Sequence, residues 1–79
     1  MGYLIDVAKV RFLNLGLTER QADVMHRLFM GSTNKEIAKD LKISEKAVKW
    51  HLTNIYQLTK AKNRKDLMVY IIQKGIYDR

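Results

Sequence analysis

Basic side chains gather in the second half of this 79-residue sequence, and their chemistry is that of anion binding. Residues 1–40 carry a net charge of +1, whereas residues 41–79 carry +6. A basic surface attracts polyanions such as nucleic acid, because each neutralised phosphate releases counterions. A solvated surface shows the same charge, so composition leaves both interpretations open. Between residues 42 and 65, Glu45 is the one acidic residue among seven basic ones: Lys42, Lys46, Lys49, Lys60, Lys62, Arg64 and Lys65.

Residue types that would support catalysis or metal binding are few. The sequence has no cysteine and two isolated histidines, His26 and His51, which do not make a metal site. It contains no glycine-rich phosphate loop, no paired carboxylates in a plausible pocket and no nucleophile beside a base. We therefore expect no enzyme, no catalytic residue, no cofactor and no metal.

The length and composition indicate one small globular domain, with 47% hydrophobic and 29% charged residues. A chain of this size buries only about 60% of its unfolded surface, so close helix packing or self-association must stabilise it. No apolar run approaches the ~20 residues of a membrane span. The first residues lack the pattern of a signal peptide. We expect a soluble, cytoplasmic protein.

The segments that carry and orient the basic residues are predicted to be helices. The sequence has no proline and only four glycines, which are spaced as helix ends. Residues 3–15 carry an apolar stripe of Leu4, Ala8, Phe12 and Leu15 that ends at Gly16. Four further helices are predicted to begin after Ser, Thr or Asn caps and to end near residues 30, 41, 59 and 74. The predicted caps are Thr18 (with Gln21), Thr33 (with Glu36), Ser44, and Asn63 (with Asp66).

The two helices between residues 33 and 59 form a helix-turn-helix pattern. A short capped helix, a tight turn at residues 42–43 and a longer helix at about 44–59 follow one another. The longer helix has the size of a recognition helix in the major groove. Its inward face is predicted to be Ala47, Val48, His51, Leu52, Ile55 and Leu58. Its outward stripe, with side chains suited to reading bases, is Lys46, Lys49, Trp50 and Thr53.

The last helix contains six consecutive apolar residues at 67–72, more than one packing face can bury. Since a thin core needs support, we expect a homodimer through this helix. The expected interface residues are Leu67, Met68, Tyr70, Ile71 and Ile72.

Residues 17–75 resemble the LuxR-type (GerE-like) helix-turn-helix domain. The similar segments follow in the same order and spacing as in that family, at residues 17–21, 31–38, 41–44, 48–51, 55–56 and 63–64. The resemblance implies a four-helix DNA-binding domain of a transcription regulator that dimerises through its last helix. Together with residues 3–15, it predicts an all-α fold with an additional N-terminal helix. We expect a helical extension at 1–16, the DNA-binding domain at 17–75 and a tail at 76–79, similar to the stand-alone members.

The resemblance also suggests roles for single residues. Base contacts of the family correspond to Lys49, Trp50 and Thr53, with Lys46 nearby. Family phosphate contacts correspond to the start of the short helix, where free backbone N–H groups suit an anion. The start of the last helix has the same character. The resulting phosphate candidates are Thr33, Asn34, Lys35, Asn63, Arg64 and Lys65.

Three positions depart from the family pattern. Ala47 replaces a common threonine and so removes a hydroxyl, and Trp50 is unusually large for its place. Thr59-Lys60-Ala61 stands where Leu-Gly-Val is usual, so the recognition helix could continue beyond this point. These departures and the N-terminal helix keep an alternative open. A protein-interaction module, such as an anti-activator or co-regulator, would bind another regulator or RNA polymerase.

Overall fold

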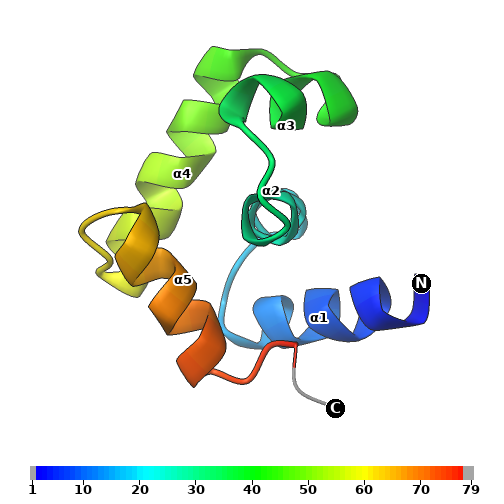
Figure 1. Cartoon of the computed structure of the whole chain (residues 1–79), viewed down its shortest axis with the longest axis vertical. Coiled ribbons are helices and arrows are strands. Elements are labelled where there is room, and N and C mark those ends of the chain that lie inside the picture. Colours follow the sequence, from blue (N-terminus) through cyan, green and yellow to red (C-terminus); the bar gives the residue numbers. More distant parts are fainter. Residues whose placement is uncertain (1, 78–79) are drawn as a thin grey trace.

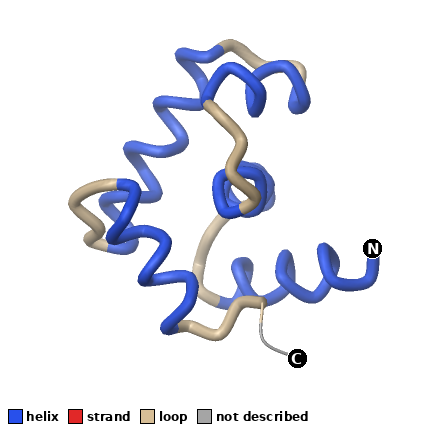
Figure 2. The backbone as a smooth tube through the Cα atoms, in the orientation of Figure 1, coloured by secondary structure: helices blue, strands red, loops and turns tan. Residues whose placement is uncertain are grey.

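The computed structural model describes the backbone of residues 2–77 and the side chains of residues 7–77. Figure 1 looks along the second helix, which lies at the centre of the molecule with the other four around it. The described residues contain no strand, and short loops join the helices (Figure 2). The all-α prediction is therefore confirmed. The helices are α1 (Gly2–Asn14), α2 (Glu19–Phe29), α3 (Asn34–Leu41), α4 (Glu45–Thr59) and α5 (Arg64–Gln73).

Each helix from α2 to α5 begins at a side chain that accepts a hydrogen bond from the backbone. Thr18 Oγ1 accepts from the Gln21 N–H at 3.2 Å, and the Gln21 amide oxygen accepts from the Thr18 N–H at 2.8 Å. Thr33 makes the same reciprocal pair with Glu36. Ser44 and Asn63 cap α4 and α5 through their own side-chain oxygens. The four predicted caps are confirmed, and each satisfies an N–H that a helix start leaves without an acceptor.

Two helices end at a lysine in the left-handed conformation. Lys42 follows α3 with φ of 57°, and Lys60 follows α4 with φ of 61°. The recognition helix therefore ends at Thr59, and the longer α4 that its missing glycine suggested is not formed. A lysine side chain is strained in this region of φ/ψ space, which favours glycine.

The core lies where α2 meets α1, α3 and α4, with α5 packed on α4. One prediction about the apolar residues is wrong. Leu58 was expected on the inward face of α4 but is 47% exposed. The largest fully buried side chains are Phe12, Met25, Leu28, Ile37, Ile55, Leu67, Ile71 and Ile76.

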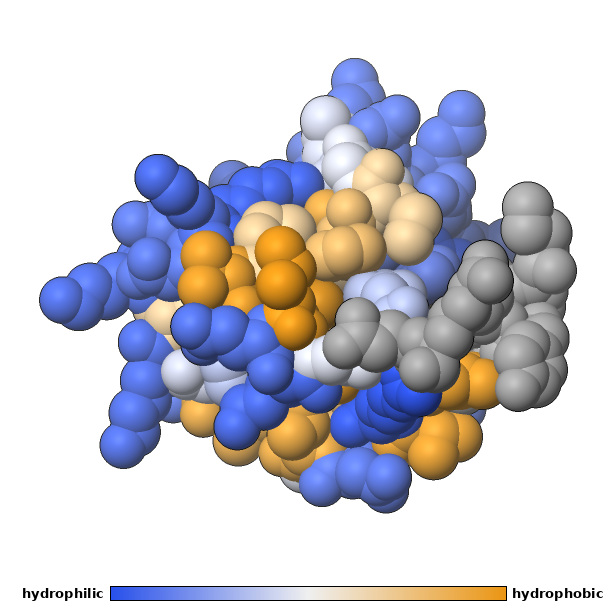
Figure 3. Space-filling view, turned by 60° about the horizontal axis from the view of Figure 1, so that its bottom comes forward, coloured by the Kyte–Doolittle hydropathy of each residue, from blue (hydrophilic) through white to orange (hydrophobic). Residues whose placement is uncertain are grey.

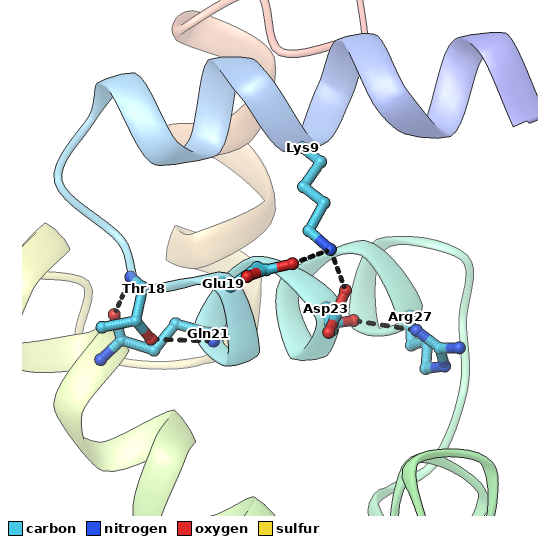
Figure 4. Close-up of polar contacts among 6 residues, drawn as sticks. All are labelled: Lys9, Thr18, Glu19, Gln21, Asp23 and Arg27. Carbon is cyan, nitrogen blue, oxygen red and sulfur yellow. Dashed lines mark hydrogen bonds and ion pairs between the residues drawn. The ribbon is translucent and has the colours of Figure 1, made fainter.

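Helix α1 is part of this core rather than a separate extension. Ala8 and Phe12 are buried, as their apolar stripe predicted, while the Leu4 side chain lies outside the described residues. Lys9 Nζ lies 3.0 Å from a Glu19 carboxylate oxygen and 3.4 Å from an Asp23 carboxylate oxygen, so it joins α1 to α2 (Figure 4). The described part of α1 thus packs against α2 of the same chain.

The chain after α5 returns to the start of the domain. Arg11 donates to the carbonyl oxygens of Gly75 and Ile76, at 2.9 and 3.0 Å. Ile76 is buried, although the sequence suggested a tail from this residue on; residues 78–79 lie outside the described part.

The ring of Tyr77 closes the same end of the core. It stacks on Phe29 at 4.3 Å, and its hydroxyl lies 2.7 Å from His26 Nδ1. Burial raises the pKa of Tyr77 and lowers that of His26. His26 is therefore a half-buried partner of the C-terminal residues.

Candidate DNA-binding face

Helix α4 has two chemically distinct sides. Val48, Leu52 and Ile55 are buried against the rest of the domain. The side chains of residues 46, 49, 50 and 53 are all exposed, and their spacing places them together on the opposite side. The core therefore fixes the direction in which the four predicted base-reading residues point. Below, the recognition face means the exposed side of α4 formed by Lys46, Lys49, Trp50 and Thr53.

The turn before α4 sets the angle between α3 and the recognition helix. The left-handed Lys42 reverses the chain, and the Ile43 N–H donates to the Ala38 carbonyl at 3.0 Å. Ile43 packs against the core, and Ser44 then caps α4 with a 3.0 Å bond from the Ala47 N–H. Two packed helices with this tight connection are the helix-turn-helix that the sequence predicted.

Trp50 is the largest side chain on the recognition face and is 62% exposed. Its ring contacts His51 edge to face, with centroids 5.0 Å apart and an angle of 68° between the ring planes. His51 is half buried, and its Nδ1 has no hydrogen-bond partner in the described structure. Burial, with a smaller effect of Arg20, lowers the pKa of His51. The His51 imidazole, whose charged form burial disfavours, therefore contacts the indole ring from one side.

The hydroxyl of Thr53 is already occupied. Thr53 Oγ1 donates to the Lys49 carbonyl oxygen at 3.0 Å, one turn earlier in the same helix. Gln57 is exposed seven residues after Trp50, so it extends the recognition face by one turn. The sequence analysis missed Gln57, although the seven-residue spacing was a signal for it.

The first predicted phosphate cluster surrounds the start of α3. The Thr33 side chain caps the helix, and Lys35 is exposed beside it. The backbone N–H groups of Asn34 and Lys35 lie in the first turn of α3, so no carbonyl of the helix can accept a hydrogen bond from them. Glu36 places a carboxylate at the same helix end, and hydrogen bonds from Thr33 lower the pKa of that carboxyl. The cationic group here is Lys35.

The second predicted phosphate cluster lies at the start of α5, and one contact joins it to the first. Arg64 Nη2 donates to the Ser32 carbonyl oxygen at 2.8 Å, although the two residues lie 32 positions apart in sequence. The Asn63 amide oxygen caps α5 by accepting from the Asp66 N–H, while Lys65 is exposed. The Arg64 side chain thus links the start of α5 to the turn that precedes α3.

Helix α5 divides the predicted dimer interface into two sets. Leu67 and Ile71 are fully buried in the protomer's own core and offer no surface to a partner. Ile72 is 66% exposed, while Met68 and Tyr70 are half buried. Val69, which the sequence analysis did not include, is also exposed. Only the second set is accessible for association.

Apolar side chains also gather on the face at the lower end of Figure 1, which is turned forward in Figure 3.

No helix in the described chain is long and apolar enough to cross a membrane. The described side chains also contain no group of three or more that could hold a metal ion.

Known proteins resemble this chain over most of its length. A family model described as bacterial regulatory proteins, luxR family, matches residues 15–71. The chain is 39% identical to the spore germination protein GerE of Bacillus subtilis (strain 168) over 59 residues, 75% of this chain and 80% of that protein. It is 40% identical to the nitrate/nitrite response regulator protein NarP of Escherichia coli (strain K12) over 58 residues, 73% of this chain and 27% of NarP.

A third relative, the CsgBAC operon transcriptional regulatory protein of Escherichia coli (strain K12), is 44% identical over 48 residues. That match covers 61% of this chain and 22% of the relative. The chain thus spans most of GerE but only about a quarter of NarP and of the CsgBAC regulator. No solved structure gave a significant match. With the family model covering both the helix-turn-helix and most of α5, the chain belongs to the luxR family of bacterial regulatory proteins.

Proposed function

We propose that this protein binds duplex DNA as a homodimer and regulates transcription, with α4 lying in the major groove. The observation that carries the proposal is the two-sided α4. The residues that hold it in the domain are buried on one side, and the recognition face is exposed on the other. The names of NarP and of the CsgBAC regulator describe regulators, which supports the same role. Acting on DNA would place the protein in the cytoplasm.

The recognition face suits the major groove, which is wide enough to admit one helix and carries the base-specific groups. Lys46 and Lys49 would approach the acceptors on guanine edges, and Trp50 and Thr53 would contact neighbouring bases. Within the described residues no ion pair engages Lys46 or Lys49. Their charges are therefore available to DNA without first breaking an internal contact.

The joined starts of α3 and α5 would bind the DNA backbone. Lys35, Arg64 and Lys65 supply positive charge, and the first-turn N–H groups of α3 point away from that helix. Thr33, Asn34 and Asn63 lie beside them, with Thr33 and Asn63 acting chiefly as caps. Contacts of this kind hold a protein on DNA without reading sequence.

The homodimer would form through the exposed residues of α5. Ile72 and Val69 lie three residues apart and therefore on neighbouring parts of one helix face. A two-fold axis through this face would present two recognition helices to two half-sites in opposite orientation. The preferred DNA would then be an inverted repeat.

Selection from a library of random duplexes tests the proposal. We expect an inverted repeat from the wild-type protein, with binding that weakens steeply as salt increases. Lys49→Ala should alter the selected sequence, whereas the matched variant Lys35→Ala should lower affinity for every sequence. If the folded protein enriches no sequence, the proposal fails. The alternative of a partner-binding module would then explain the exposed Trp50 better.

A further inference from the structure

We infer that the recognition face reads thymine, through the 5-methyl group of that base, at the positions facing Trp50 and Thr53. The inference rests on the proposed function and adds to it the class of base that α4 selects. It follows from the apolar groups that the recognition face offers to DNA after its internal hydrogen bonds are taken into account.

Trp50 brings the largest apolar surface to the middle of the recognition face. Its exposed ring has one donor, Nε1–H, and no acceptor, so most of its surface can make only apolar or stacking contacts. The edge-to-face contact with His51 limits the ring positions open to it. The free protein therefore presents a supported apolar ring to solvent, which is unfavourable unless a partner covers it.

Thr53 offers a methyl group but no free donor in this position. Its hydroxyl hydrogen is donated to the Lys49 carbonyl, so that donor is already used, while the oxygen can still accept a hydrogen bond. The γ-methyl group is the part of this exposed side chain that can make an apolar contact. Ala47, predicted on the inward face, is half exposed and adds a methyl group at the border of the recognition face, three residues before Trp50. The middle of the recognition face is apolar, with Lys46 and Lys49 on the same side of α4.

Major-groove chemistry offers one apolar partner for such a surface. All four bases present hydrogen-bonding groups there, and thymine alone adds a methyl group, which threonine methyl and aromatic side chains contact well. A helix that read bases through hydrogen bonds at positions 50 and 53 would carry Arg, Lys, Asn or Gln side chains there. In this chain those positions hold Trp50 and Thr53.

Deoxyuridine provides the test, since it differs from thymidine only by the 5-methyl group. The duplex obtained from the random-library selection would be synthesised with each thymine replaced in turn by uracil. We expect one or two positions per half-site at which the substitution weakens wild-type binding about fourfold. This loss is equivalent to about 0.8 kcal/mol for burial of one methyl-sized group. Other thymines should show no effect.

Three variants connect the effect to particular side chains. Trp50→Ala and Thr53→Ser, which removes the methyl but keeps the hydroxyl, should each reduce the thymine-to-uracil affinity ratio at a sensitive position toward one. Lys35→Ala is the matched control, because it should weaken binding to both duplexes and leave the ratio unchanged. All three side chains are exposed, so circular dichroism should show wild-type folding. The chain has a single tryptophan, so quenching of its fluorescence on binding reports on Trp50 directly.

The outcomes separate this inference from the proposed function. A selected inverted repeat whose affinity is unchanged by uracil at every position would overturn thymine reading and leave DNA binding established. A thymine effect that persists in both Trp50→Ala and Thr53→Ser would also overturn it, since other residues would then carry the contact. If no duplex is selected, the proposed function fails and thymine reading fails with it.

Discussion

Replacing Lys60 by glycine should stabilise the protein, because Lys60 adopts a backbone conformation that favours glycine. Its φ and ψ are 61° and 20°, immediately after the last residue of α4. Thr59 Oγ1 holds the turn on both sides by donating to the Ile55 carbonyl at 2.9 Å and accepting from the Ala61 N–H at 3.3 Å. The turn can therefore persist when the Lys60 side chain is removed.

The size of the effect follows from two opposing terms. The left-handed conformation costs a residue with a Cβ about 1–2 kcal/mol. Glycine loses more backbone freedom on folding, which offsets about 0.5–1 kcal/mol of that gain. The net stabilisation of Lys60→Gly should be about 0.5–1 kcal/mol. For a domain of this length it corresponds to a rise in Tm of about 2–8 °C.

Thermal unfolding followed by circular dichroism measures this effect. Lys60→Gln is the matched control, because it removes the charge but keeps the Cβ, and its Tm should stay close to that of the wild type. Lys49→Gly, at an exposed position in the interior of α4, should lower stability by about 1 kcal/mol. An unchanged or lower Tm for Lys60→Gly would refute the reasoning that the backbone at this position is strained.

Four further expectations concern binding, assembly and the C-terminal contacts. Lys49→Ala should weaken binding to the selected DNA by about 1–3 kcal/mol and relax the preference at one base pair. Lys35→Ala should instead lower the salt dependence of binding for all sequences. Competition titrations at several salt concentrations distinguish the two effects. Ile72→Glu should give a folded monomer in sedimentation velocity, and a persistent dimer would exclude α5 as the interface. Tyr77→Phe removes only the hydroxyl bonded to His26 and should lower the free energy of unfolding in urea by about 1 kcal/mol. Burial holds the pKa of His26 in the folded protein below its ordinary value of 6.5, so the unfolded chain takes up the proton more readily. The stabilising effect of the neutral His26 should therefore be full above about pH 6.5 and should fall below that pH. His26→Gln should reduce this fall in unfolding titrations from pH 7 to pH 5.

The sequence predicts helix starts well because their determinants are local. A capping side chain and the N–H that it accepts from lie three residues apart, so Thr18, Thr33, Ser44 and Asn63 could each be found from the neighbouring residues. The direction of the recognition face was predictable for a similar reason. Once Val48, Leu52 and Ile55 are taken as buried, helical spacing places the exposed residues on the other side.

Contacts between distant residues could not be predicted in this way. Arg11 and the carbonyl of Gly75 are 64 residues apart, and no local pattern indicates that they meet. The bond from Arg64 to the Ser32 carbonyl, which links the two predicted phosphate clusters, likewise joins residues 32 positions apart. Leu58 shows a related limit. Periodicity places it near the edge of a buried face, but only the position of the neighbouring helix decides whether that edge is covered.

The apolar run of α5 shows how one sequence pattern serves two purposes that the sequence alone cannot separate. Its length indicates more buried surface than one face provides, and the structure assigns Leu67 and Ile71 to the protomer. Substitution of either residue would remove core packing and unfold the domain, so its effect on assembly would be uninterpretable. Ile72 is two-thirds exposed, and a charge there leaves the protomer core intact. The dimer interface, if α5 forms it, must therefore be a narrow strip around Ile72 and Val69 that contributes little to the fold of a single chain.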